Sequence, residues 1–214
     1  MSGQSGKANI QVLVPLFGIL LFAAIYLTAA SLYPGGSQAD TAAKGFSWLH
    51  NYWCNLLNEH AINGEPNTAR PVAIAGMFIL ALSMSVFWFQ FGRLTKLEKA
   101  TQRLIRFSGI ISMCTGFFLF TGYHHDAIIN ITGLLAAFAF AGTFAGLYKM
   151  RWRRLFWFGI FNLVLIALNN FIYYTGGLIA WLPIVQKITF FFFLTWICLI
   201  DIRLYILADQ KNLP

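Results

Sequence analysis

Residues 71–92 read "PVAIAGMFILALSMSVFWFQFG" and lie between Arg70 and Arg93 without a charged residue of their own. A helix needs about 20 such residues to cross the ~30 Å hydrocarbon core of a membrane, and this stretch is long enough. Across the 214 residues of the chain, 58% are hydrophobic and 10% are charged, against about 25% charged in an average soluble domain. These features place the chain in the class of membrane proteins.

Further segments of similar length and composition occur along the chain. The predicted membrane spans cover residues 10–32, 71–92, 105–122, 127–148, 155–176 and 182–207. No repeat or linker separates them, so we expect an all-α, polytopic integral membrane protein whose six transmembrane helices form a single domain over residues 1–214. The first span lacks a clear cleavage pattern and is expected to be a retained helix, although its Ala-rich end leaves processing open.

The basic residues are divided unevenly between the connections. The net charge is +8, yet only Lys44, Arg70 and Lys187 of the 15 Lys and Arg residues fall on one predicted side of the membrane. The positive-inside rule therefore predicts that both termini and residues 93–106 and 149–154 are cytoplasmic. Residues 34–70, 123–126 and 177–181 are predicted to lie outside. This pattern indicates a multi-pass protein of the cytoplasmic membrane and argues against a nucleic-acid partner.

Residues 46–60, "FSWLHNYWCNLLNEH", have helical periodicity within the longest connection. The apolar arc comprises Phe46, Leu49, Trp53, Leu56 and Leu57, and the opposite arc comprises Ser47, Asn51, Cys54, Asn55 and Asn58. We expect a short amphipathic extracytoplasmic helix whose apolar arc packs on the mouth of the helices. Its amides are expected either to line a polar cavity or to hydrogen-bond loops and water.

Residues 121–133, "TGYHHDAIINITG", place two histidines and an aspartate before the fourth span. Asp126, Asn130, Gly133 and Ala137 share one helical face, which we expect to point into the bundle. Asp126 is a favourable N-cap. We also expect its carboxylate to organise an outer polar cluster with at least one of His50, His124, His125 and Lys187.

The last two spans add isolated polar residues. Asn162 is expected to link helices, and Asn169 and Tyr173 either link helices or line a cavity. Lys187 is expected to extend outward to the interface or to pair with Asp126. The candidate ligand-binding residues are Ser47, His50, Asn51, Asn55, His124, His125, Asp126, Asn130, Asn169, Tyr173 and Lys187.

One part of the chain resembles a known family. The string "FSWLHNYWCNLLNEHAINGEPNTARPVAIAGM" at residues 46–77, with "YPGGS" at residues 33–37, resembles bacterial and archaeal six-helix multi-pass proteins with a domain of unknown function. That family is distantly similar to damage-regulated autophagy modulator and lipid-remodelling membrane proteins. The resemblance implies a six-helix fold, an extracytoplasmic loop with a short helix, and a polar motif opening the fourth span, here His124, His125 and Asp126. An aspartate is common in the family where this chain has Asn55, which argues against acid–base or metal chemistry there.

Three function classes are consistent with these features. The pattern favours a non-enzymatic integral membrane protein whose outward-facing polar pocket binds a lipid or other amphiphile, or docks a membrane protein or a second copy. The alternative is a zinc-dependent hydrolase of lipid esters or amides, with His50, His124, His125 and Asp126 as metal ligands. A small-molecule transporter is the third class. No cofactor is favoured, because adjacent histidines alone are a weak metal signal and no nucleotide-binding or protease motif occurs.

Overall fold

The computed structural model describes residues 10–118 and 125–210, with the backbone alone described at 125 and 126. The described residues form an all-α structure, and 78% of them are helical. Isolated β-bridges pair Gly35 with Lys44 and His60 with Pro66, and the described residues contain no strand. The predicted all-α class is therefore confirmed.

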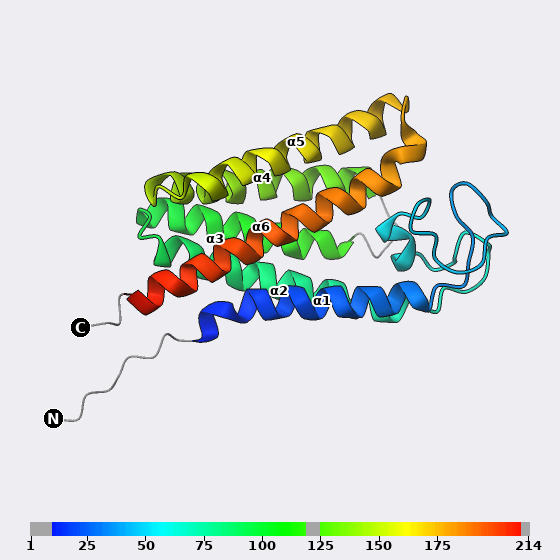
Figure 1. Ribbon diagram of the computed structural model, residues 1–214, viewed down its shortest axis with the longest axis horizontal. Helices are drawn as coiled ribbons and strands as arrows, with labels where there is room; N and C mark the ends of the chain where they lie inside the picture. The colour runs from blue at the N-terminus through cyan, green and yellow to red at the C-terminus, as the bar shows by residue number, and fades with distance from the viewer. Residues whose placement is uncertain (1–9, 119–124, 211–214) are drawn as a thin grey trace. The chain divides into compact units, whose positions relative to one another are not determined.

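Six α-helices are present in the described part of the chain (Figure 1). They are α1 Val14–Ser31, α2 Arg70–Leu94, α3 Lys99–Gly116, α4 His125–Lys149, α5 Arg153–Thr175 and α6 Leu182–Gln210. The 3-10 helices η1 Ile10–Leu13 and η4 Ile179–Trp181 precede α1 and α6. Among the residues described, five helical segments are long and apolar enough to cross a membrane, and α3 is not one of them. Its first turns carry Lys99, Arg103 and Arg106.

The chain forms two compact units, and several helices contribute to both. The first unit comprises the chain up to residue 19, residues 80–157 and the chain from residue 196. The second unit comprises residues 20–79 and 158–195.

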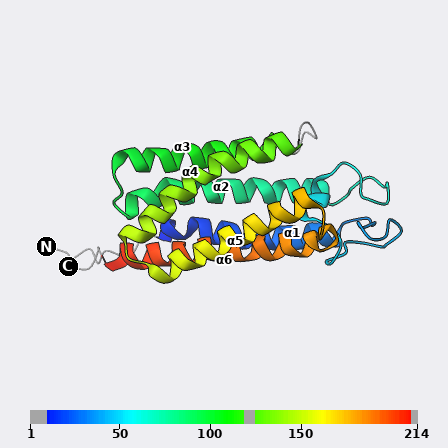
Figure 2. The ribbon, with the colours of Figure 1, turned by 90° about the horizontal axis from the view of Figure 1, so that it is seen from above.

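In the first unit, glycines allow helices to approach closely. A Cβ at Gly109 of α3 would lie 2.4 Å from the Trp88 ring, and one at Gly142 of α4 would lie 2.2 Å from Ile105. Small residues at such positions favour helix association in membranes because backbones and large side chains meet there. The pair α3 and α4, side by side in Figure 2, is also joined by the Ser112 hydroxyl, which donates to the Thr132 carbonyl at 3.0 Å.

In the second unit, the long connection (residues 32–69) lies beyond the C-terminal end of α1 and the N-terminal end of α2 (Figures 1 and 2). The Trp53 ring packs against Tyr26 of α1, with the ring centroids 5.2 Å apart, and against Phe46 at 5.9 Å. Leu56 is fully buried. The long connection is thus folded around an aromatic and apolar core.

The helix predicted over residues 46–60 is wrong. Within that stretch, the helical residues are those of η2, the 3-10 helix Trp53–Leu57. The physical reason lies in the asparagine side chains, which bond to backbone amides within the stretch. Asn51 Oδ1 accepts from the Ser47 N–H at 2.8 Å, and Asn55 Oδ1 accepts from the Tyr52 N–H at 2.7 Å. Such local side-chain bonds favour turns over helix.

The predicted docking arc is correct only in part. Leu56 is buried as expected, whereas Leu49 is 58% exposed. Because the chain turns at residues 48–50 instead of continuing a helix, Leu49 no longer lies on the same face as Leu56.

Candidate functional site

Asn51 lies at the centre of the long connection and is fully buried. Its Nδ2 donates to the Gly36 carbonyl at 2.9 Å, while its Oδ1 accepts from the Ser47 N–H. Gly36 has a φ of +82°, and a Cβ there would lie 2.3 Å from the Asn63 amide nitrogen, so the close approach requires glycine. Of the two roles predicted for the amides of Asn51 and Asn55, these contacts support the bonding of loops.

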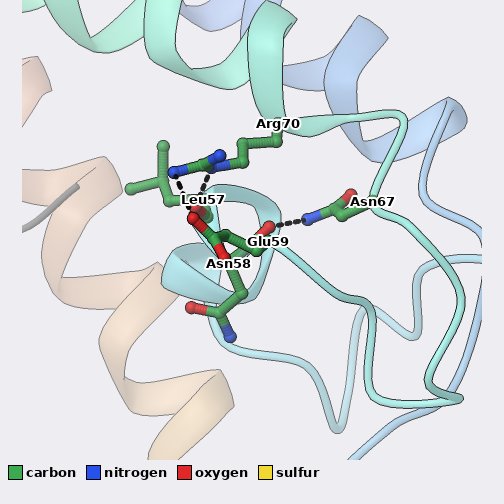
Figure 3. Close-up of polar contacts among 5 residues, drawn as sticks. All are labelled: Leu57, Asn58, Glu59, Asn67 and Arg70. Carbon is green, nitrogen blue, oxygen red and sulfur yellow. Dashed lines mark hydrogen bonds and ion pairs between the residues drawn. The ribbon is translucent and has the colours of Figure 1, made fainter. Parts of the chain in front are cut away.

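A second amide, Asn67, ties η2 to the start of α2 (Figure 3). Its Nδ2 donates to the carbonyls of Asn55 at 3.0 Å and Asn58 at 2.9 Å, and its Oδ1 accepts from the Ala69 N–H at 3.1 Å. From the first turn of α2, Arg70 donates through Nε to the Leu57 carbonyl at 3.1 Å. The side chains of Asn67 and Arg70 therefore both hold the end of η2.

Arg70 also forms an ion pair with Glu59, with 3.5 Å between the nitrogen and oxygen atoms (Figure 3). The Glu59 side chain is 73% exposed, so this pair contributes little to stability compared with the buried amide bonds.

Two residues of α6 bind the same connection. Gln186 accepts through Oε1 from the Trp53 N–H at 3.0 Å. The ammonium of Lys187 donates to the carbonyls of Asn51 and Pro183, and it lies 5.8 Å from the Phe46 ring centroid. An ammonium has three donors, so one N–H is left after these two bonds. Within the described ranges, no carboxylate lies within 4 Å of it.

Two of the candidate ligand-binding residues, Ser47 and His50, lie close together and hydrogen-bond to each other. The Ser47 hydroxyl and His50 Nδ1 are 3.2 Å apart, and the same hydroxyl accepts from the His50 N–H at 3.3 Å. This arrangement is a local turn in which the serine side chain binds backbone.

Cys54 belongs to η2 and is half-buried. Burial raises the pKa of its thiol above the ordinary value, and the nearby Lys187 ammonium opposes this shift only in part. Burial also raises the pKa of Tyr33, whose hydroxyl accepts from the Ile62 N–H at 2.9 Å. Both groups are therefore neutral at pH 7, and Cys54 is expected to be a slow nucleophile.

The face of α4 that carries Asn130 is oriented differently from the prediction. Asn130, Gly133 and Ala137 are all exposed, and a Cβ at Gly133 would meet no atom within 4 Å. The expectation that this face points into the bundle is wrong, because α4 packs on α3 through Thr132, Ala139 and Gly142 instead. His124 and the side chains of His125 and Asp126 lie outside the described residues, so the Asp126 cluster stays a prediction.

The polar residues of α5 mainly bind helix backbones. Asn162 is buried and donates to the Phe158 carbonyl of its own helix at 2.9 Å, rather than linking helices as predicted. Asn169 links α5 to α6 through bonds to the Thr189 hydroxyl and, at 3.5 Å, to the Val185 carbonyl. The Tyr173 ring is exposed and packs edge-on against Tyr174 with centroids 5.2 Å apart. Asn169 thus joins helices, one of its two expected roles.

Sequence reasoning missed Asp201, a fully buried carboxylate on α6 in the first unit. Its Oδ2 accepts from the Leu16 N–H in the first turn of α1 at 3.2 Å, and its Oδ1 accepts from Gln90 Nε2 of α2 at 3.1 Å. Gln90 also donates to the Val12 carbonyl at 2.8 Å. An anion is favourable at the positive end of a helix, so Asp201 stabilises the start of α1. The signal was an acidic residue inside a predicted span.

Residues that could hold a metal are dispersed in the described part of the chain. His50, Cys54 and Glu59 belong to the long connection, and no group of three or more His, Cys, Asp or Glu side chains converges among the described residues. The predicted zinc ligands His124, His125 and Asp126 fall where side chains are not described. No protein-family model, curated protein or solved structure matches this chain.

Proposed function

We propose that this chain is a six-span integral membrane protein with both termini in the cytoplasm and the long connection outside. In this topology α3 belongs to the third span, beside the five segments that are apolar enough to cross a membrane. The uneven distribution of Lys and Arg supports this orientation, and the resemblance of residues 33–77 to a six-helix family is in line with it.

Labelling of single cysteines tests this topology in a variant whose Cys54, Cys114 and Cys198 are replaced by serine. Ala39 of the long connection and Lys99 at the start of α3 are both exposed, so neither substitution disturbs a buried contact. Ala39→Cys is expected to react with an impermeant maleimide from outside intact cells, and Lys99→Cys only after permeabilisation. The reverse pattern would reject the orientation.

The function proposed for the outer side is non-enzymatic binding of an amphiphile with an acidic headgroup. The observation that carries it is the Lys187 ammonium, which is half-buried against backbone carbonyls and the Phe46 ring, with a donor left and no carboxylate within 4 Å among the described residues. A charge held partly away from water gains free energy when an anion pairs with it. A small acidic headgroup suits a single cation better than a protein surface does.

Lipid mass spectrometry and elemental analysis of the purified full chain in detergent test this function. An acidic amphiphile is expected to co-purify with the parent and with Lys187→Arg, and about tenfold less with Lys187→Met, since a charge-assisted bond contributes about 1.5–3 kcal/mol. Lys44→Met removes an exposed charge from the same connection and serves as the matched control. Equal amounts of the amphiphile in all variants would reject the proposal, and stoichiometric zinc would favour the hydrolase instead.

A further inference from the structure

A second polar site lies in the first unit, where the turn after α4 meets the last turns of α6. A cavity of about 600 Å³ is present there. It is lined by Arg151, Trp152, Arg153, Arg154, Leu155, Leu199, Ile202, Arg203 and Ile206, which we call the arginine pocket. The Trp196 indole N–H donates to the Leu155 carbonyl at 2.7 Å, which holds the start of α5 against α6.

The arginine pocket combines four guanidinium groups with an apolar wall. Leu199, Ile202 and Ile206 recur at helical spacing on α6, and each of these side chains is more than one third exposed. Arg203 lies on the same stripe, with its guanidinium carbon 5.8 Å from the Trp152 ring centroid. The pocket therefore places cations next to an exposed apolar strip.

The positive charge of this pocket is not balanced by acidic side chains. Among the residues whose side chains the structure describes, no carboxylate lies within 4 Å of these four arginines. Arg153 and Arg154 also stand in the first turn of α5, where acidic residues are absent. The amino end of a helix carries partial positive charge, so these arginines are placed where an anion, not a cation, is favourable.

Arg151 adds an unfavourable backbone conformation to the same site. Its φ of +54° is left-handed, a conformation in which glycine is the usual residue after a helix. Two carbonyls in the last turn of α4 are already bonded, since the Gly146 carbonyl accepts from the Met150 N–H at 2.9 Å and the Leu147 carbonyl accepts from the Trp152 N–H at 3.0 Å. Repulsion among the arginines, the helix dipole and this backbone conformation each destabilise the folded pocket. A bound anion would offset the first two effects.

We propose that the arginine pocket binds an anionic glycerophospholipid, with its phosphate among the guanidinium groups and an acyl chain along Leu199, Ile202 and Ile206. Arginine binds phosphate oxygens through paired N–H donors, and basic pockets at the cytoplasmic ends of membrane helices are suited to anionic headgroups. This inference rests on the proposed membrane topology and is independent of the Lys187 site.

Native mass spectrometry and thermal unfolding of the delipidated full chain in a neutral detergent test the proposal. Titration with phosphatidylglycerol is expected to load the pocket and raise the unfolding midpoint, whereas phosphatidylcholine should not. The Arg154→Gln/Arg203→Gln variant should weaken phosphatidylglycerol binding by about tenfold or more. Lys99→Gln/Arg103→Gln removes the same charge from the exposed start of α3 and should leave affinity within about twofold, because exposed charges contribute little. An equal loss of phosphatidylglycerol affinity in both variants would mean that the lipid is attracted by the overall positive charge, and it would overturn the proposed site.

Two further arms separate the lipid from a free anion and from misfolding. Ile202→Ser/Ile206→Ser should weaken phosphatidylglycerol binding without changing the response to inorganic phosphate. Inorganic phosphate that binds as tightly as the lipid would overturn the lipid assignment. Arg151→Gly removes one guanidinium group, so it should weaken lipid binding. Because glycine relaxes the left-handed backbone, the variant should unfold at a temperature no lower than that of the parent. Unchanged lipid affinity in Arg151→Gly and in Arg154→Gln/Arg203→Gln would reject the pocket.

Discussion

The long connection and the arginine pocket use polar side chains in opposite ways. In the long connection, Asn51, Asn55 and Asn67 bond backbone groups at distances of 2.7–3.1 Å and are themselves buried. In the arginine pocket, the guanidinium groups face a cavity and meet no carboxylate within the described residues. Polar side chains that hydrogen-bond to backbone groups stabilise the fold. Charged side chains that face a cavity without a counter-ion remain available to a ligand.

The largest effect is expected at Asn51. Asn51→Ala leaves the buried Gly36 carbonyl and the part-buried Ser47 N–H without their partner, and each orphaned group costs about 1–3 kcal/mol. We expect the free energy of unfolding in detergent to fall by about 3 kcal/mol or more. Asn58→Ala is the control because its side chain is exposed, and it should stay within about 0.5 kcal/mol. Equal effects of the two variants would mean that the amides do not hold the connection.

Asp201 tests whether the first unit also contains a polar residue used by the fold. Asp201→Asn keeps the size of the side chain but loses one of its two acceptor oxygens, so either the Leu16 N–H or Gln90 Nε2 loses a partner. We expect a loss of about 1–2 kcal/mol in the free energy of unfolding. Asp209→Asn on the exposed end of α6 should change it by less than about 0.5 kcal/mol. An unchanged free energy of unfolding in Asp201→Asn would mean that the fold does not depend on Asp201, as we propose for the arginines of the pocket.

The positions of the helices could be predicted from the sequence better than which of their faces are buried. Hydropathy located most of the segments near their observed bounds, because apolar runs end at charged residues such as Arg70 and Arg93 or at the glycines Gly176 and Gly177. The exception is α3, which begins at Lys99, six residues before the predicted span. Hydropathy could not separate buried faces from exposed ones, since lipid and protein interior are equally apolar. Gly109 and Gly142 pack tightly in the first unit, whereas a Cβ at Gly133 would meet no atom within 4 Å, and no pattern in the sequence distinguishes them.

The candidate site was predictable only in part, for a related reason. Periodicity indicated a helix over residues 46–60 because it counts side chains and ignores their bonds to backbone. The contact of Lys187 with the Asn51 carbonyl joins residues 136 positions apart, which spacing cannot reveal. The arginine pocket was visible as a basic turn, but its apolar wall comes from α6, far along the chain.

Cys54 provides a kinetic test of how tightly the long connection is folded. Because burial raises the pKa of its thiol, the thiolate fraction at pH 8 is lower in the folded protein than in the unfolded chain. In a variant with Cys114 and Cys198 replaced by serine, we expect alkylation at pH 8 to be at least about fivefold slower before unfolding than after it, and to accelerate as the pH rises above the ordinary cysteine range. Equal rates in folded and unfolded protein would indicate an open connection.

The smallest effect, and the one with the opposite sign, is expected at Arg153. Glutamate in the first turn of a helix interacts favourably with the helix dipole by about 0.3–1 kcal/mol, and Arg153→Glu also removes repulsion from Arg151 and Arg154. In lipid-free detergent we therefore expect a gain of about 0.5 kcal/mol in the free energy of unfolding. Arg106→Glu is the control, because the Arg106 Nε donates to the Phe89 carbonyl at 3.1 Å and its loss should destabilise. A loss of stability in Arg153→Glu would show that this arginine is used by the fold, as Asn51 is, and the contrast between the two regions would fail.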